Sequence, residues 1–234
     1  MDYVGAFAGQ QAMTVGTNRS TTLFREACTA LPGPLLIADV AAGKGVTACA
    51  LAAGLEARVL AFDLMRAFVV AAGAAVQERG LAARVGAIVA EGTQLPLPDG
   101  ACDAASCLGA PSILGLPGSL HELSRITRPG GIVAVSDAFL RDGAPSDLPT
   151  EMAELPALPG YLQMLRVAGL RPLSQHAHLL EDWIAYLAPL RSTADRVERE
   201  GEAGLAAEIR GMVEAERAAA ESALDYVTII ARRE

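Results

Sequence analysis

The chain has 234 residues, of which 52% are apolar, and a formal net charge of −8. This length suits one sizeable core, or one domain with a small cap. The negative charge argues against nucleic acid or an anionic membrane surface as a partner. No run approaches the roughly 18 uncharged apolar residues that a membrane span needs, and residues 1–9 lack the positive segment of a secretory signal. We therefore expect a cytoplasmic protein without a membrane span.

Four cysteines are spread along the first half of the chain: Cys28, Cys49, Cys102 and Cys107. Their spacing matches neither a metal site nor a disulfide framework. We expect free thiols in a reducing compartment and no bound metal.

Short apolar runs alternate with helical patterns in the middle of the chain. The expected strands cover residues 34–40, 57–64, 84–91, 101–109 and 131–139. The expected helices between them cover residues 46–55, 66–80 and 118–131, the last stopped by a proline and two glycines. This alternation predicts an α/β fold with a doubly wound parallel sheet. Ligands in such sheets bind outside the carboxyl ends of the strands.

The pattern changes beyond residue 140. A loop rich in proline, glycine and acids precedes a short helix at residues 161–170 and a strand at residues 171–179. Residues 181–222 are expected to be mostly helical, with interruptions at Pro189 and Gly201, before a strand at residues 225–233. We divide the chain into an N-terminal helical lid (1–30), a core (31–140), and a substrate-side insertion with helices and the final strand (141–234).

The first candidate ligand loop reads IADVAAGKGVTA, residues 37–48. Gly43, Gly45 and Ala48 fit the dinucleotide fingerprint G-x-G-x-x-G/A, and Asp63 ends the next strand eighteen residues after Gly45. A carboxylate there suits the two hydroxyls of a ribose. Lys44 lacks the Walker pattern of a phosphate-binding lysine. These residues alone leave open a nicotinamide-dependent oxidoreductase and a different nucleoside site.

Longer motifs narrow this choice. Residues 39–45 (DVAAGKG) resemble the first motif of class I S-adenosylmethionine-dependent methyltransferases, with Ala41 in place of its first glycine. The segments AEGTQLPLPDGACD and ELSRITRPGGIVAVSD resemble later motifs of the same superfamily. The resemblance covers about residues 35–140 and the last strand. With the GKG variant and the segment YLQMLRVAGL, the chain looks like the small-molecule branch known as methyltransferase type 11, which includes quinone-biosynthesis and arsenite enzymes.

The resemblance implies a fold, a cofactor and a reaction. The fold is a Rossmann-like seven-stranded sheet with an antiparallel last strand and a helical insertion before it. The cofactor is S-adenosyl-L-methionine, converted to S-adenosyl-L-homocysteine as its methyl passes in line to a small molecule. If position 41 needs a positive φ, Ala41 carries a strain of order 1 kcal/mol. The implied cofactor-binding residues are Asp39, Ala41, Gly43, Gly45, Asp63, Leu64, Glu91, Gly92, Thr93 and Leu108.

The acceptor stays open. Arsenite is disfavoured because no cysteines lie in the second half of the chain, and the amino-methylating tetrapeptide N/D-P-P-Y/F is absent after the fourth strand. A general base is needed only for an acceptor that is protonated at working pH. The candidates are His121, Asp137 and His176, each of which also has a structural reading as a solvated or capping residue.

Aromatic side chains in the substrate-side segments supply candidate pocket walls: Tyr3, Tyr161, Trp183 and Tyr186. Gly16 and Thr17 are candidates to close the pocket, although Ser20 or Thr21 fits a helix N-cap equally well. We expect a monomer or homodimer. The alternatives left open are a cyclase-like enzyme that binds S-adenosylmethionine without methylating, and an inactive partner subunit.

Overall fold

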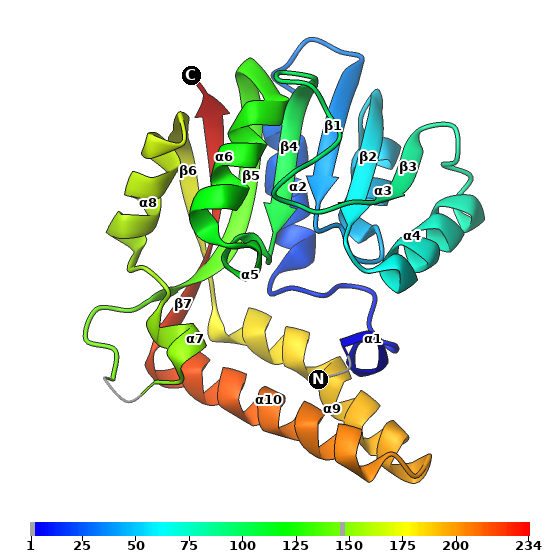
Figure 1. Cartoon of the computed structure of the whole chain (residues 1–234), viewed down its shortest axis with the longest axis vertical. Helices are drawn as coiled ribbons and strands as arrows, with labels where there is room; N and C mark the ends of the chain where they lie inside the picture. The colour runs from blue at the N-terminus through cyan, green and yellow to red at the C-terminus, as the bar shows by residue number, and fades with distance from the viewer. Residues whose placement is uncertain (1–2, 146–147) are drawn as a thin grey trace.

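The structure, a computed structural model, describes residues 3–145 and 148–234. Its centre is a seven-stranded sheet in the order β3-β2-β1-β4-β5-β7-β6, in which β7 is antiparallel to both of its neighbours (Figure 1). The expected sheet with an antiparallel last strand is therefore confirmed. The strands are β1 (Leu35–Val40), β2 (Ala57–Asp63), β3 (Val85–Val89), β4 (Cys102–Leu108), β5 (Thr127–Leu140), β6 (Leu170–His178) and β7 (Leu224–Arg233).

Helices cover both faces of the sheet. One apolar cluster joins the strands to α2 (Thr17–Cys28), α3 (Val46–Gly54) and α4 (Arg66–Glu78). A second cluster joins them to α6 (Leu116–Ile126) and α8 (Leu158–Val167), while the short α5 (Pro111–Leu114) follows β4. Phe24 and Cys28 of α2 are fully buried in the first cluster. Within the first 30 residues, α2 thus packs on the sheet, and the segment before it is left to cover the edge.

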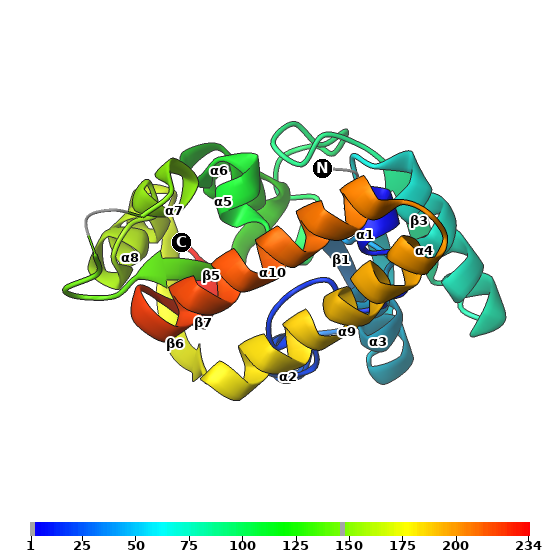
Figure 2. The same cartoon turned by 90° about the horizontal axis from the view of Figure 1, so that it is seen from below.

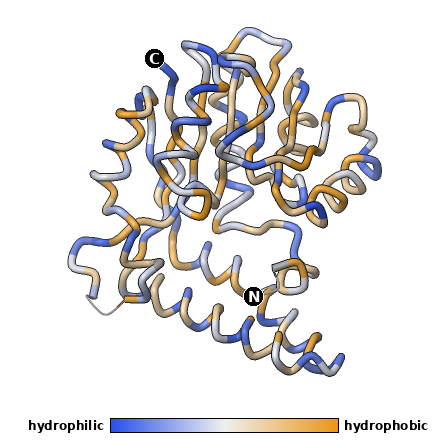
Figure 3. Tube along the Cα trace, in the orientation of Figure 1, coloured by the Kyte–Doolittle hydropathy of each residue, from blue (hydrophilic) through white to orange (hydrophobic). Residues whose placement is uncertain are grey.

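A helical hairpin crosses the edge of the sheet at which β1 and β4 end (Figures 1 and 2). It consists of α9 (Leu180–Arg199) and α10 (Ala203–Ser222), which confirms the expected helical insertion before the last strand. Hydrophobic and hydrophilic residues alternate along both helices, as expected for helices with one buried face (Figure 3). The N-terminal α1 (Tyr3–Ala6) contacts both helices, and α7 (Thr150–Ala153) lies in the loop after β5.

Pro189 does not interrupt the helix, contrary to the sequence expectation. The helix α9 runs through this residue from Leu180 to Arg199 and ends before Gly201. A proline in a helix leaves the carbonyl four residues earlier without its hydrogen bond. That carbonyl belongs to Ala185, an exposed residue beside a surface hollow, so water can satisfy it. Among the described residues no helix is long and apolar enough to cross a membrane.

Candidate active site

The loop after β1 is held in an unusual backbone conformation. Ala41, Gly43 and Gly45 have φ angles of 54°, 53° and 74°. Ala41 is the one non-glycine residue in the described chain with such an angle, and its Cβ makes this conformation cost about 1 kcal/mol. A Cβ on Gly43 would lie 3.1 Å from the Sδ of Met13, and one on Gly45 would lie 3.0 Å from the Cβ of Ala72. Gly43 and Gly45 are therefore favoured both by their positive φ angles and by the close approach of Met13 and Ala72.

Asp39 is a buried acid at the base of this loop. It is 2% exposed, and its Oδ1 accepts a hydrogen bond of 2.7 Å from the Ser106 hydroxyl. Its Oδ2 is buried without a hydrogen-bond partner of good geometry among the described residues. Burial raises the pKa of Asp39 to about 7, against the opposing effects of the Ser106 hydroxyl and the Ala48 amide. An unpartnered buried carboxylate oxygen next to a glycine loop fits a ligand with a cationic or donor group.

Asp63 ties the end of β2 to the same loop. Its Oδ2 accepts the Gly43 amide at 2.8 Å, and its Oδ1 accepts the Met65 amide at 2.8 Å. Each carboxylate oxygen has a second lone pair available for another donor. Leu64, the next residue, is 60% exposed beside it. Asp63 thus organises the glycine loop and keeps acceptor capacity for a sugar diol.

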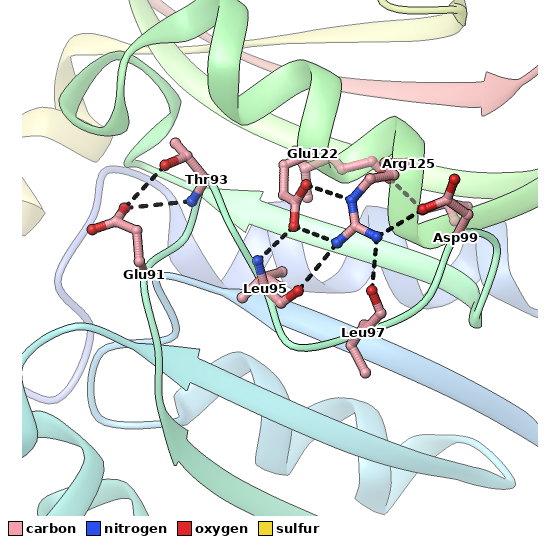
Figure 4. Close-up of polar contacts among 9 residues, drawn as sticks. Glu91, Thr93, Leu95, Leu97, Asp99, Glu122 and Arg125 are labelled. Carbon is pink, nitrogen blue, oxygen red and sulfur yellow. Dashed lines mark hydrogen bonds and ion pairs between the residues drawn. The ribbon is translucent and has the colours of Figure 1, made fainter.

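The segment after β3 completes this edge of the sheet. The exposed Glu91 folds back so that its Oε1 accepts the Thr93 amide at 3.4 Å and the Thr93 hydroxyl at 3.3 Å (Figure 4). A Cβ on Gly92 would lie 2.8 Å from the Cδ1 of Leu114 of α5, so a larger residue here would have to displace that side chain. Leu108, 9% exposed, ends β4. The ten expected cofactor residues thus follow or end β1, β2, β3 and β4, which are adjacent in the sheet.

Two of the motifs behind the family resemblance hold each other in place (Figure 4). Glu122 of α6 accepts the Leu95 amide at 2.6 Å and is paired with Arg125 at 2.7 Å. Arg125 also donates to the carbonyls of Leu95 and Leu97, at 3.1 and 2.7 Å, and pairs with Asp99 at 2.8 Å. The LPLPDG and ELSR segments therefore form a structural clamp that fixes the loop between β3 and β4.

An N-terminal strap, residues 7–16, crosses the same edge. A Cβ on Gly43 would lie 3.1 Å from the Sδ of Met13, and a Cβ on Gly109, after β4, would lie 2.0 Å from the Thr14 hydroxyl. At the end of the strap, a Cβ on Gly16 would lie 2.0 Å from Nδ1 of His178. The strap thus runs over the loops that follow β1 and β4 and ends against β6. Its last residue, Gly16, is one of the two residues that the sequence suggested would close the pocket.

The three candidate bases are not brought together. Asp137 of β5 is buried, and it accepts the Ser112 amide at 2.7 Å, the Ser112 hydroxyl at 2.9 Å and the Ala138 amide at 2.9 Å. Burial raises its pKa to about 6, which these hydrogen bonds oppose. His121 is exposed in the second turn of α6, not in the first turn as expected. His176 lies on the edge strand β6, within 3.1 Å of the Ser174 hydroxyl.

The candidate aromatic walls are only partly brought together: Trp183 and Tyr186 of α9 share one apolar cluster, whereas Tyr161 lies in another. Trp183 is 6% exposed and packs edge-on against Tyr226 at a centroid distance of 5.6 Å. Tyr186 stacks on Phe7 of the strap at 6.5 Å. Tyr161 is fully buried in α8, and its hydroxyl has no hydrogen-bond partner among the described residues. The side chain of Tyr3 lies outside the described residues.

Sequence reasoning missed Tyr226, which lies beneath the strap. The hydroxyls of Tyr226 and Thr14 are hydrogen-bonded at 2.6 Å, which joins β7 to the strap. His178 is buried, and its Nε2 lies 2.8 Å from the Thr228 hydroxyl. The available signal was the alternation of Tyr226 and Thr228 with apolar residues along the last strand, because polar groups on a buried strand need partners.

Comparison with known proteins agrees with this geometry. A family model described as a methyltransferase domain matches residues 38–135. The fold is similar to that of an S-adenosylmethionine-dependent methyltransferase from Geobacter sulfurreducens in complex with S-adenosyl-L-homocysteine, at 21% identity and a TM-score of 0.82 over 99% of this chain and 97% of that one. A methyltransferase from Thiobacillus denitrificans gives 20% identity and a TM-score of 0.82 over 99% and 98%. The fold is also similar to that of the (4+2)-cyclase SpnF, at 23% identity and a TM-score of 0.77 over 97% of this chain and 89% of that one.

Residues 38–135 are a methyltransferase domain, and the chain around them has the fold of the class I S-adenosylmethionine-dependent methyltransferases. The family resemblance and the enzyme class inferred from the sequence are confirmed. A methyltransferase domain of this kind also agrees with the expected S-adenosylmethionine cofactor.

Proposed function

We propose that this protein transfers the methyl group of S-adenosyl-L-methionine to a small-molecule acceptor that binds against the strap. When bound, the cofactor supplies an electrophilic methyl group on a sulfonium sulfur. The observation that carries the proposal is the buried, unpartnered Oδ2 of Asp39 at the base of the loop with three positive φ angles. A free carboxylate oxygen beside a loop whose backbone a ligand can approach closely fits the charged amino acid portion of the cofactor.

The residues present fit the rest of the cofactor. Gly43 and Gly45 would line its methionine portion, and Asp63 would accept the ribose hydroxyls with the lone pairs that its two amide hydrogen bonds leave free. Glu91 would release Thr93 to accept the adenine amino group, since both of those hydrogen bonds are long. Leu64, which is 60% exposed, supplies an apolar surface for the adenine ring.

The acceptor side is proposed to lie between the strap and α9. A hollow of about 400 Å³ is lined there by Gln10, Thr14, Gly16, Asp182 and Tyr186, among others. Gln10 is 4% exposed, and its Oε1 has no hydrogen-bond partner among the described residues. This volume and this mixture of aromatic and amide groups suit a small organic molecule. The strap would exclude water from the reacting centre when closed.

Asp137 is the strongest candidate base. It ends the unbroken buried run of β5 beside the helix α5, and one lone pair on its Oδ2 remains after three hydrogen bonds. With a pKa of about 6 it is ionised at neutral pH and can take a proton from a hydroxyl or amine acceptor. His121, being exposed, serves as a matched control.

The thiols support a proposed cellular setting. Cys28, Cys49, Cys102 and Cys107 are buried and unpaired. Burial raises the pKa of Cys107 well above its ordinary value, so this thiol is unreactive. Free thiols of this kind fit a reducing compartment, and we place the reaction in the cytoplasm.

The test is production of S-adenosyl-L-homocysteine from a fractionated metabolite extract, with transfer of a deuterated methyl group detected by mass spectrometry. We expect one fraction to yield both labelled product and S-adenosyl-L-homocysteine. Asp137→Asn should lose activity, while His121→Asn should keep it. A product formed without consumption of the cofactor would favour the cyclase reading, for which the similarity to SpnF is the supporting observation.

A further inference from the structure

Lys44 is the only lysine in the sequence; the other 18 of the 19 basic residues are arginines. It lies between the two glycines of the cofactor loop and is 8% exposed. Its Nζ donates to the carbonyl oxygens of Phe7, Gln10 and Ala8, at 2.5, 2.8 and 3.1 Å. An ammonium group has three N–H donors, so all of them are used by the strap.

The residue type matches the geometry. Three carbonyl oxygens converge on one nitrogen, which suits the compact ammonium group of a lysine. An arginine would present its donors in a flat fork, spread over several ångströms, and could not meet the same three acceptors at one point. All 18 remaining Lys or Arg positions of the chain are arginines, and the single lysine is placed where an arginine would not fit.

Lys44 joins two parts of the proposed site. Its neighbours Gly43 and Gly45 form the loop that would hold the methionine portion of the cofactor, with φ angles of 53° and 74°. Further along, the strap covers the site through the Thr14–Tyr226 hydrogen bond of 2.6 Å. On its other side the strap is bound to α9, because Nε2 of Gln10 donates to the Tyr186 carbonyl at 3.0 Å.

We propose that Lys44 is a positioning residue through which the cofactor loop holds the strap closed over the acceptor. A cofactor that orders the loop then fixes the lysine and stabilises the closed strap, and a closed strap strengthens cofactor binding by the same factor. This inference rests on the proposed function, since it takes the loop to be the cofactor site.

The single lysine makes the test direct. Apart from the chain's own α-amino group, Lys44 carries the only aliphatic amine, so an acetylating N-hydroxysuccinimide ester reports its exposure by mass spectrometry. We expect saturating S-adenosyl-L-homocysteine to slow acetylation of Lys44 about tenfold or more, which corresponds to about 1.4 kcal/mol of additional closure. The α-amino group provides the internal reference for reagent activity.

The outcomes separate the two claims. If calorimetry shows that S-adenosyl-L-homocysteine binds but Lys44 is acetylated equally fast with and without it, or resists acetylation equally in both states, the coupling is wrong and the cofactor site stands. If the ligand does not bind, the proposed function fails and the inference fails with it.

Three variants provide a second test. Lys44→Met keeps most of the length of the side chain, one atom shorter, but removes its donors, and Lys44→Arg keeps its charge. Arg84→Met is the control. Arg84 lies just before β3, and its exposed side chain donates to the backbone carbonyl of Leu55 at 3.3 Å. We expect Lys44→Met to bind S-adenosyl-L-homocysteine about tenfold more weakly and to lose much of the Tm rise that the ligand gives. Lys44→Arg should recover little of either, because its flat fork cannot meet the same three carbonyl oxygens, and Arg84→Met should match the unmodified protein.

A merely structural lysine would lower the Tm of the free and ligand-bound protein equally. A Lys44→Met protein with the normal ligand-induced rise in Tm and normal affinity would overturn the proposal.

Discussion

Asp63→Asn separates two roles of the Asp63 carboxylate: its hydrogen bonds to the loop backbone and its proposed hydrogen bonds to the cofactor. In the structure each oxygen of Asp63 accepts one backbone amide, Gly43 on Oδ2 and Met65 on Oδ1. An asparagine of the same shape has one oxygen and one NH₂ group, so in either orientation one amide meets a donor. Losing one hydrogen bond to a charged acceptor costs about 1.5 kcal/mol at a half-buried position.

The same substitution removes charge assistance from the proposed hydrogen bonds to the ribose hydroxyls. That loss is worth about another 1.5 kcal/mol, or about tenfold in affinity. We therefore expect Asp63→Asn to lower the free energy of unfolding by about 1.5 kcal/mol, measured in urea, and to raise the Kd for S-adenosyl-L-homocysteine about tenfold.

Asp99→Asn is the matched control, because it makes the same chemical change in a side chain that is 79% exposed and paired with Arg125. It should cost less than about 1 kcal/mol in stability and leave the affinity unchanged. A folded Asp63→Asn protein that binds S-adenosyl-L-homocysteine within about twofold of the unmodified protein would refute the assignment of Asp63 to the cofactor.

Three further predictions concern the same edge of the sheet. Because burial raises the pKa of Asp39 from 3.8 to about 7, the folded chain keeps this proton where the unfolded chain has lost it, so the contribution of Asp39 to stability falls as pH rises through that window. The ionised form should bind the ligand's ammonium group, so affinity for S-adenosyl-L-homocysteine should rise between about pH 6 and pH 8, and Asp39→Asn should abolish the rise; a pH-independent Kd counts against the contact. Ala41→Gly relieves a positive φ and should raise the free energy of unfolding by about 0.5 kcal/mol, after the entropy of the unfolded glycine is subtracted; a loss of stability in urea would show that the strain is absent. Glu122→Leu removes the acceptor of the Leu95 amide and one of the two carboxylate partners of Arg125, and should cost about 3 kcal/mol in thermal or urea unfolding, whereas a loss under about 1 kcal/mol would mean that the clamp is dispensable.

The cofactor half of the site could be predicted from the sequence because its signals are local. The loop of residues 39–45, the acid that ends β2 and the segment after β3 each lie within a few residues of a strand end, and the sheet order then brings them together. The clamp explains why the two later motifs are informative as a pair, since Arg125 bonds to Leu97 and Asp99 directly.

The acceptor half depends on contacts between distant parts of the chain. Thr14 and Tyr226 are separated by 212 positions, and no local pattern predicts their hydrogen bond. His121 was placed in the first turn because the helix was expected to begin at residue 118; α6 begins at Leu116, with a proline in its first turn, so His121 lies in the second turn, where it is exposed. Of the two histidines that alternate along β6, the structure buries His178 beneath the strap.

The most direct measurement is calorimetric titration of the purified protein with S-adenosyl-L-homocysteine and, separately, with NAD⁺. The account predicts one binding site for S-adenosyl-L-homocysteine with a Kd in the micromolar range, weakened by Asp63→Asn, and no measurable heat with NAD⁺. Binding of NAD⁺ in preference to S-adenosyl-L-homocysteine, or no binding of S-adenosyl-L-homocysteine by the folded protein, would contradict it.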